Sequence, residues 1–105
     1  MTKMNRFLLV LAAVVCLAGA VSSAQSGGEA TYKAKCAMCH GATGVPSAGM
    51  AKAMGILPVS DPAIKKLTAA EMFTAVKNGK GKMKPIAGLT DAQIKDAVAY
   101  YRGLK

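Results

Sequence analysis

The sequence has few of the side chains that form structural zinc sites: one histidine, His40, and three cysteines. One cysteine, Cys16, lies in an apolar N-terminal run that we expect to be removed, and the other two are Cys36 and Cys39. A structural zinc site takes four ligands, and no second pair of cysteines or histidines follows. This shortage excludes a zinc site, and the single histidine excludes a metal held by two imidazoles.

The sequence also lacks strand patterns, because the part after residue 24 shows no alternation of β-branched and polar residues. No internal repeat or long low-complexity tract is present either. Three segments begin instead with Ser or Thr followed three positions later by Glu or Gln, the capping box that opens helices. The three pairs are Ser26 with Glu29, Thr68 with Glu71, and Thr90 with Gln93. The sequence therefore predicts an all-α fold.

We expect helices over residues 27–39, 69–77 and 91–104, with a short fourth piece after Asp61. Asp61 can cap that piece, and Pro62 suits its first helical position. Glycine, serine and proline mark residues 41–55 and 78–89 as loops. In the last helix, apolar residues recur at spacings of three and four and predict one buried stripe: Ile94, Ala97, Val98, Tyr101 and Leu104.

The N-terminus has the composition of an export signal. Lys3 and Arg6 precede an apolar run over residues 7–21, which is shorter than the roughly 20 residues of a membrane-spanning helix. Small residues follow, so we expect cleavage after Ala24. A second cleavage signal at residues 18–20 and a retained membrane anchor stay as alternatives.

Removal of residues 1–24 would also remove Cys16, which lacks the preceding small residue of a lipoprotein site. Residues 25–105 would then form one domain of 81 residues in the periplasm, a monomer without stable membrane insertion. A chain of this length is too short to bury a large core unaided, so something other than its own side chains must stabilise it.

Acidic residues are scarce, since five Asp and Glu stand against 14 Lys and Arg in the whole chain. Two of the basic residues precede residue 25, so the exported part keeps a formal charge of +7. Such a surface favours acidic or anionic partners. An exported protein rarely meets nucleic acid, and the aromatic residues lie in helix faces rather than between lysines. We therefore expect an acidic protein partner and no nucleic acid.

Residues 36–40, Cys-Ala-Met-Cys-His, have the spacing of covalent haem attachment. Thiols three residues apart lie on neighbouring turns of one helix face, so Cys36 and Cys39 can bond to two vinyl groups on one edge of a porphyrin. A thiol-disulfide oxidoreductase would place such a pair after a strand, and a disulfide across this short spacing stabilises little. We expect one covalent haem c, with His40 as the proximal ligand of its iron.

The second ring nitrogen of His40 should donate to a backbone carbonyl, at Pro46 or a neighbour, which would fix the ring. The sixth ligand cannot be another histidine, so methionine, lysine, a weaker group or none remain. Met83 lies in a glycine-rich segment, residues 78–85, that can bring backbone close to a flat cofactor. The other methionines of the exported part are assigned to the motif, to pocket lining or to helix packing: Met38, Met50, Met54 and Met72. We expect His40 and Met83 to hold the iron, with lysine ligation or simple packing of Met83 as alternatives.

Three lysines, Lys80, Lys82 and Lys84, flank Met83. Their charges could simply keep an exposed loop in solution, or they could surround the haem edge. In the second case a positive collar would steer acidic redox partners so that the electron path is short. We expect this collar to be the partner surface.

The motif and the helix pattern resemble those of class I cytochromes c, in particular the short soluble bacterial monohaem type. The likeness extends over essentially all of residues 25–105. Two pairs look like the small and aromatic side chains at which the family's first and last helices cross: Gly28 with Tyr32, and Ala97 with Tyr100. The methionine segment is also similar, but Lys84 separates Met83 from Pro85, where the family often has proline directly after the ligand.

The resemblance implies a small all-α fold of four or so short helices wrapped around one haem, with one haem edge exposed. It also implies an electron carrier that is not an enzyme. Two alternatives stay open: a haem enzyme or gas sensor with an open sixth position, such as a peroxidase, and a haem subunit anchored in a larger redox complex. Because haem would supply the missing core, we expect the apoprotein to be largely unfolded.

Overall fold

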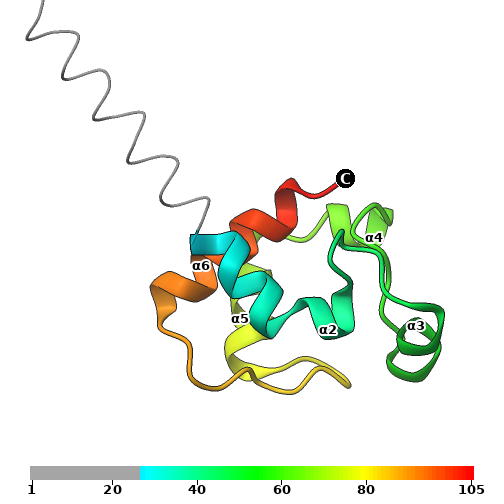
Figure 1. Ribbon diagram of the computed structural model, residues 1–105, viewed down its shortest axis with the longest axis horizontal. Helices are drawn as coiled ribbons and strands as arrows, with labels where there is room; N and C mark the ends of the chain where they lie inside the picture. Colours follow the sequence, from blue (N-terminus) through cyan, green and yellow to red (C-terminus); the bar gives the residue numbers. More distant parts are fainter. Residues whose placement is uncertain (1–26) are drawn as a thin grey trace, which may run out of the picture.

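The computed structural model describes residues 27–105. The predicted export signal at residues 1–24 with its Cys16, and the predicted cap Ser26, lie outside this range. Within it the chain is helical and contains no sheet, which confirms the all-α prediction (Figure 1). Residues 27–35 are helical, and five helices follow: α2 (Ala37–His40), α3 (Ala48–Met54), α4 (Pro62–Lys65), α5 (Ala69–Asn78) and α6 (Asp91–Gly103). None of these described helices is long and apolar enough to cross a membrane.

The helix predicted over residues 27–39 is divided in two. Its first part ends at residue 35, and Cys36 adopts a φ of −117° before α2 begins. Hydrogen bonds bridge the break, since the Cys36 amide donates to the Tyr32 carbonyl at 2.8 Å and the His40 amide donates to the Cys36 carbonyl at 3.0 Å. The chain therefore changes direction at Cys36, and residues 36–40 form one compact turn.

Helix α3 lies where the sequence predicted a loop over residues 41–55, so that prediction is wrong. Ser47 caps the helix by accepting from the Met50 amide at 3.2 Å, and Gly55 ends it with a φ of +67°. Met50 occupies the position at which a capping box has Glu or Gln, so the box pattern did not reveal this helix. The remaining signals were a Ser before the helix and a glycine in the left-handed conformation after it.

The other three predicted helices are present. Asp61 accepts from the Ala63 amide at 2.8 Å, and Pro62 begins α4, as predicted. Helices α5 and α6 end one residue away from the predicted ends. Complete capping boxes open both of these helices: Thr68 with Glu71, and Thr90 with Gln93. Capping chemistry therefore located the helix starts well.

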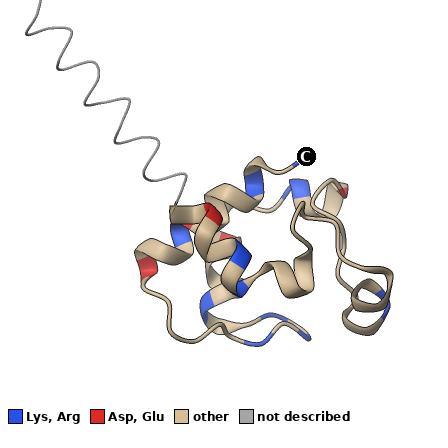
Figure 2. Ribbon diagram, viewed as in Figure 1, with Lys and Arg blue, Asp and Glu red and all other residues tan. Residues whose placement is uncertain are grey.

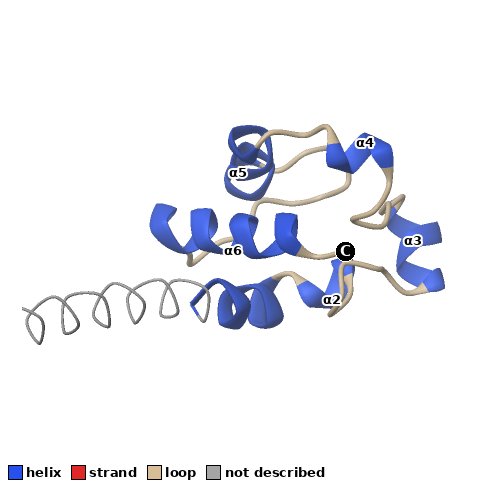
Figure 3. Cartoon of the chain, turned by 90° about the horizontal axis from the view of Figure 1, so that it is seen from above, coloured by secondary structure: helices blue, strands red, loops and turns tan. Residues whose placement is uncertain are grey.

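The core lies where the first helix runs beside α6 (Figure 3). A Cβ atom added at Gly28 would overlap the carbonyl of Asp96, so the two backbones are in contact, and the predicted crossing is confirmed. Five hydrophobic residues are buried in the described part: Tyr32, Val59, Ile94, Ala97 and Val98. Tyr101 and Leu104, at the end of the predicted stripe, are half-buried.

Candidate functional site

Helix α2 carries the residues of the attachment motif. Cys36 is the residue before the helix, and Cys39 and His40 are its last two residues. Both cysteines are half-buried free thiols. Burial, and then the neighbouring Cys39, raise the pKa of the Cys36 thiol. Such a thiol stays protonated at neutral pH, unlike the activated thiolate of an oxidoreductase. The structure thus brings the three predicted attachment residues together on one turn.

The imidazole of His40 is half-buried, and its Nδ1 atom is buried without a hydrogen-bond partner in the described residues. The predicted bond to a carbonyl at Pro46 or a neighbour is therefore not formed. The following loop instead folds against Gly41, where an added Cβ would overlap the Val45 carbonyl and lie 3.3 Å from the Pro46 nitrogen. Burial lowers the pKa of His40 and so favours the neutral imidazole, the form that binds metals.

Aromatic side chains from two helices surround His40. Tyr101 of α6 meets the imidazole edge-on, with 5.4 Å between the ring centroids and 62° between the ring planes. Tyr32 of the first helix stacks on Tyr101 at 5.8 Å, and its hydroxyl donates to the Gly41 carbonyl at 2.6 Å. The sequence placed Tyr101 only in a buried stripe. Its contact with His40 was missed because spacing within one helix does not identify a partner on another.

Met83 lies on a tight hairpin between α5 and α6. The backbones of Lys80 and Met83 exchange two hydrogen bonds, each 2.9 Å long. Gly81 at the tip has a φ of +58°, and a Cβ added at Gly79 would lie 2.9 Å from the Met83 carbonyl oxygen. Gly79 therefore has no room for a side chain, and Gly81 adopts a conformation that favours glycine. The hairpin holds the Met83 side chain half-buried.

Basic residues gather on the same hairpin. Figure 2 shows basic positions and no acidic ones on the segment between α5 and α6. Lys80, Lys82 and Lys84 are all exposed. The ammonium group of Lys82 donates to the Ala53 carbonyl at 3.2 Å, and this contact joins the hairpin to the end of α3. The three lysines predicted to form a collar therefore lie exposed on one basic hairpin.

The apolar side chains of the short helices are incompletely covered. Helices α2, α3, α4 and α5 contain no buried residue. Half-buried apolar side chains occur along them and in the loops that follow: Met50, Met54, Ile56, Leu67, Met72 and Ile86. A large, flat, apolar group would cover these side chains. Two thiols that bond to a porphyrin, with an imidazole and a thioether that bind its iron, are the groups expected for a haem c held by His and Met. Within the described residues, no group of three or more His, Cys, Asp or Glu side chains could hold a bare metal ion.

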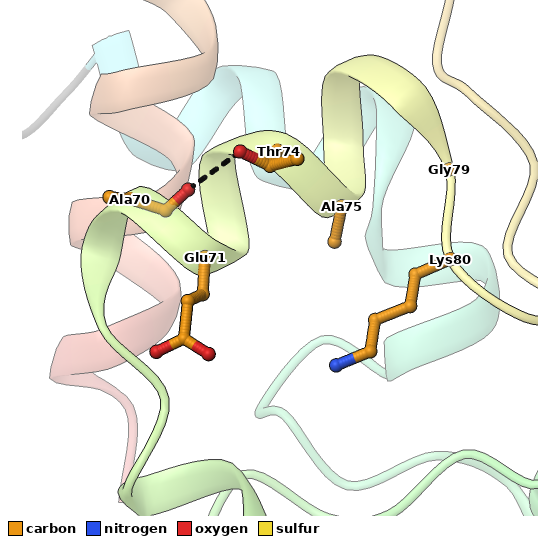
Figure 4. A pocket seen from close by; sticks show the side chains of 6 residues that line it. All are labelled: Ala70, Glu71, Thr74, Ala75, Gly79 and Lys80. Atoms are coloured by element: carbon orange, nitrogen blue, oxygen red, sulfur yellow. Dashed lines mark hydrogen bonds between the residues drawn. The ribbon is translucent and has the colours of Figure 1, made fainter.

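A separate open depression of about 400 Å³ lies on α5 (Figure 4). Its lining consists of Ala70, Glu71, Thr74, Ala75, Gly79 and Lys80. The Thr74 hydroxyl donates to the Ala70 carbonyl at 3.1 Å. The Glu71 carboxylate accepts from the Thr68 amide in the capping box of α5. The depression contains none of the predicted haem-binding residues, and its Thr74 hydroxyl and Glu71 carboxylate already have partners.

Comparison with known proteins gives a consistent result. A family model described as cytochrome c oxidase, cbb3-type, subunit III matches residues 23–100. The cytochrome c-555 of Chlorobaculum thiosulfatiphilum is 40% identical over 84 residues, which cover 72% of this chain and 91% of that protein. The cytochrome c-555 of Chlorobaculum tepidum is 34% identical over 95% of this chain and 97% of that protein. The range matched by the family model includes both the turn at residues 36–40 and the hairpin with Met83.

Proposed function

The chain belongs to the cytochrome c family, with a covalently bound haem c and its iron, and from this we propose that it carries single electrons between proteins outside the cytoplasm. The observation that supports this most is the turn at residues 36–40. There the free thiols of Cys36 and Cys39 and the half-buried imidazole of His40 lie together. The names of the two relatives, both cytochrome c-555, agree with this function.

The proposed roles of the residues follow from their chemistry. Haem iron supplies a reversible one-electron change between the ferric and ferrous states. Cys36 and Cys39 would hold the porphyrin through thioether bonds, while His40 and Met83 would bind the iron. Soft thioether sulfur favours ferrous iron, so this pair would raise the reduction potential relative to two nitrogen ligands. With both axial positions held by the protein, no site is left for a substrate, and the protein would not be an enzyme.

Replacement of Met83 by Ala tests the sixth ligand. We expect the oxidised protein to lose the weak absorption band of methionine-bound ferric haem, the potential to fall, and the ferrous protein to bind carbon monoxide. Met54→Ala, which removes a half-buried methionine that does not bind the iron in this proposal, serves as the control and should keep the band and exclude carbon monoxide. An unchanged spectrum and potential in Met83→Ala, or ready binding of carbon monoxide by the unaltered ferrous protein at neutral pH, would favour an enzyme or gas sensor.

The periplasmic location depends on the export signal predicted at residues 1–24. Members of the cytochrome c family typically work outside the cytoplasm, which supports export. The intact mass of the haem protein isolated from its host tests this part of the proposal. We expect a chain that begins at Gln25, whereas a chain that keeps the apolar run would favour a subunit anchored in a larger redox complex.

We propose that the hairpin lysines receive an acidic redox protein. Lys80 and Lys84 are exposed, and no acidic residue lies on their segment. Lys80→Gln and Lys84→Gln should each slow electron transfer with an acidic partner at low ionic strength, and added salt should remove the difference. Lys95→Gln on α6 removes the same charge elsewhere. If it slows transfer equally, net charge rather than this hairpin attracts the partner.

A further inference from the structure

Tyr32 connects the first helix to the residue that follows His40. Its side chain is 1% exposed, and its hydroxyl donates to the Gly41 carbonyl at 2.6 Å. The same carbonyl accepts a longer bond of 3.2 Å from the Gly44 amide, while the Gly41 amide donates to the Ala37 carbonyl at 2.8 Å. The peptide units on both sides of Gly41 are therefore held, and Tyr32 makes the shortest of these bonds.

A second route leads from Tyr32 to the imidazole itself. The Tyr32 ring stacks on Tyr101, with 5.8 Å between centroids and 21° between planes. Tyr101 in turn meets the His40 ring edge-on at 5.4 Å. Tyr32 thus acts on His40 through the backbone that follows it and through the ring that lies beside it.

His40 needs such support because its own second nitrogen does not provide it. Metal-binding histidines are usually fixed by a hydrogen bond from the ring nitrogen that does not bind the metal. In the described residues the Nδ1 atom of His40 has no partner. The contacts seen around the ring are its packing against Tyr101 and the backbone that follows it at Gly41.

We propose that Tyr32 is a positioning residue that fixes the orientation of the His40 imidazole on the haem iron. The proposal rests on the proposed function, because it takes His40 as an axial ligand. Orientation of an axial ligand and the hydrogen bonds around it are levers by which a protein tunes a haem.

The Tyr32 hydroxyl, and not only the Tyr32 ring, contributes to the contact with the backbone beside His40. A tyrosine hydroxyl is protonated at neutral pH, and burial raises the pKa of Tyr32 further, so its hydroxyl can donate to the Gly41 carbonyl. The Cα of Gly41 packs closely against the Val45 carbonyl, because a Cβ there would overlap it, and the Gly41 amide donates to the Ala37 carbonyl at 2.8 Å. A bond to this constrained residue is therefore transmitted to the adjacent His40.

Tyr32→Phe in the complete haem protein separates positioning from simple packing, because Phe keeps the buried ring and removes only the hydroxyl. We expect the electron paramagnetic resonance of the ferric protein and the paramagnetically shifted proton resonances of His40 to change, while the absorption band of bound Met83 persists. The unfolding equilibrium constant should rise roughly fivefold, as for a lost buried hydrogen bond.

Tyr100→Phe is the matched control. Its ring also lies against Tyr32, at 5.3 Å, but its hydroxyl makes no hydrogen bond within the described residues. We expect its resonances to match those of the unaltered protein. Tyr101→Leu, which removes the edge-on ring, should change the His40 signals and provides a second test that does not depend on Tyr32→Phe.

The outcomes can be told apart. If Tyr32→Phe loses stability but keeps the resonances of the unaltered protein, Tyr32 only packs and the proposal is overturned. The proposal is also overturned if Tyr100→Phe changes the His40 resonances as much as Tyr32→Phe does. A failure of the proposed function would show itself earlier, because the unaltered protein would then lack the spectrum of iron bound by His and Met.

Discussion

Gly28 is the residue at which the first helix and α6 come closest. A Cβ atom there would overlap the backbone carbonyl of Asp96 and would lie 3.4 Å from the Tyr100 Cβ atom. Because the nearest obstacle is backbone, no side-chain rotation can relieve the overlap, and Gly28→Ala must move the helices apart. We expect the free energy of unfolding to fall by about 1–3 kcal/mol, as for other overpacked sites.

Gly27 provides the control for this substitution. Nothing lies within 4 Å of a Cβ atom added there. Gly27→Ala should therefore be neutral or stabilise the protein by up to about 1 kcal/mol through helix propensity. Denaturant unfolding of the two haem-containing variants measures the difference. Similar stabilities for both variants would contradict the close approach at Gly28.

The identity of the site residues could be predicted from the sequence more fully than their surroundings. Cys36, Cys39 and His40 lie within five consecutive residues, so their spacing can be read directly from the sequence. The contact of His40 with Tyr101 depends on how the first helix meets α6, and no local pattern specifies that. The acceptor for His40 Nδ1 was assigned to Pro46 or a neighbour for the same reason, and that bond is not formed.

Helices α5 and α6 begin with the same capping box but with different charge. Glu71 accepts from the Thr68 amide at 3.1 Å and from its hydroxyl at 3.0 Å. These two bonds, the amide first, lower the pKa of the Glu71 carboxyl. The folded protein therefore binds this proton less readily than the unfolded chain. Its contribution to stability is present above the ordinary pKa of glutamate and is lost as the pH falls through the lowered value.

We expect Glu71→Gln to weaken the decrease in stability on the acid side. Urea unfolding of the haem protein across the acid range, at constant ionic strength, measures this change. The box of α6 offers the reciprocal variant, because Gln93 makes the equivalent bond to the Thr90 amide at 2.9 Å without a titrating group. Gln93→Glu should steepen the acid decrease. If neither variant alters how steeply the free energy of unfolding falls with pH, the charge of Glu71 does not contribute to stability through the capping box.

Lys82 connects the Met83 hairpin to the end of α3. Its ammonium group reaches the Ala53 carbonyl, one of the last in the helix, where positive charge is favourable. Lys82→Gln should release the hairpin and let added imidazole displace Met83 roughly two- to fivefold more easily, for a surface contact worth about 0.5–1 kcal/mol. Titration of the ferric protein with imidazole measures this affinity.

The two neighbouring lysines test whether charge alone explains such an effect. Lys80→Gln and Lys84→Gln remove the same charge from the same hairpin, and no hydrogen bond of either ammonium group is seen in the described part of the chain. Their imidazole affinities should remain close to that of the unaltered protein. An equal gain in all three variants would point to the charge of the hairpin and away from its contact with α3.

Element boundaries could be predicted where a complete pairwise signal existed. Helices α5 and α6 had full capping boxes, and α4 had Asp61 followed by Pro62. Helix α3 had only Ser47 and Gly55, and its glycine and alanine content resembled that of a loop. The break at Cys36 had no signal, because no proline or glycine interrupts residues 29–39 and the sequence there is compatible with one continuous helix.

The whole molecule buries few of its own side chains. The five buried hydrophobic residues of the described part belong to the first helix, to α6 and to Val59. The helices between them, α3, α4 and α5, contribute none. Within the described residues nothing covers their apolar side chains fully, and a large apolar group such as haem would do so. We therefore expect the haem to complete the core as well as to serve as the redox centre.

This arrangement predicts that folding depends on haem attachment. A variant with Cys36→Ser and Cys39→Ser cannot form the thioether bonds, and we expect it to show little helical signal in far-ultraviolet circular dichroism. The physical reason is that conformational entropy costs about 1–2 kcal/mol for each ordered residue, which five buried side chains cannot offset. The haem-containing protein should instead unfold cooperatively. A fully helical, cooperatively unfolding double variant would show that the crossing at Gly28 and the capped helices are sufficient, and that the haem contributes only redox chemistry.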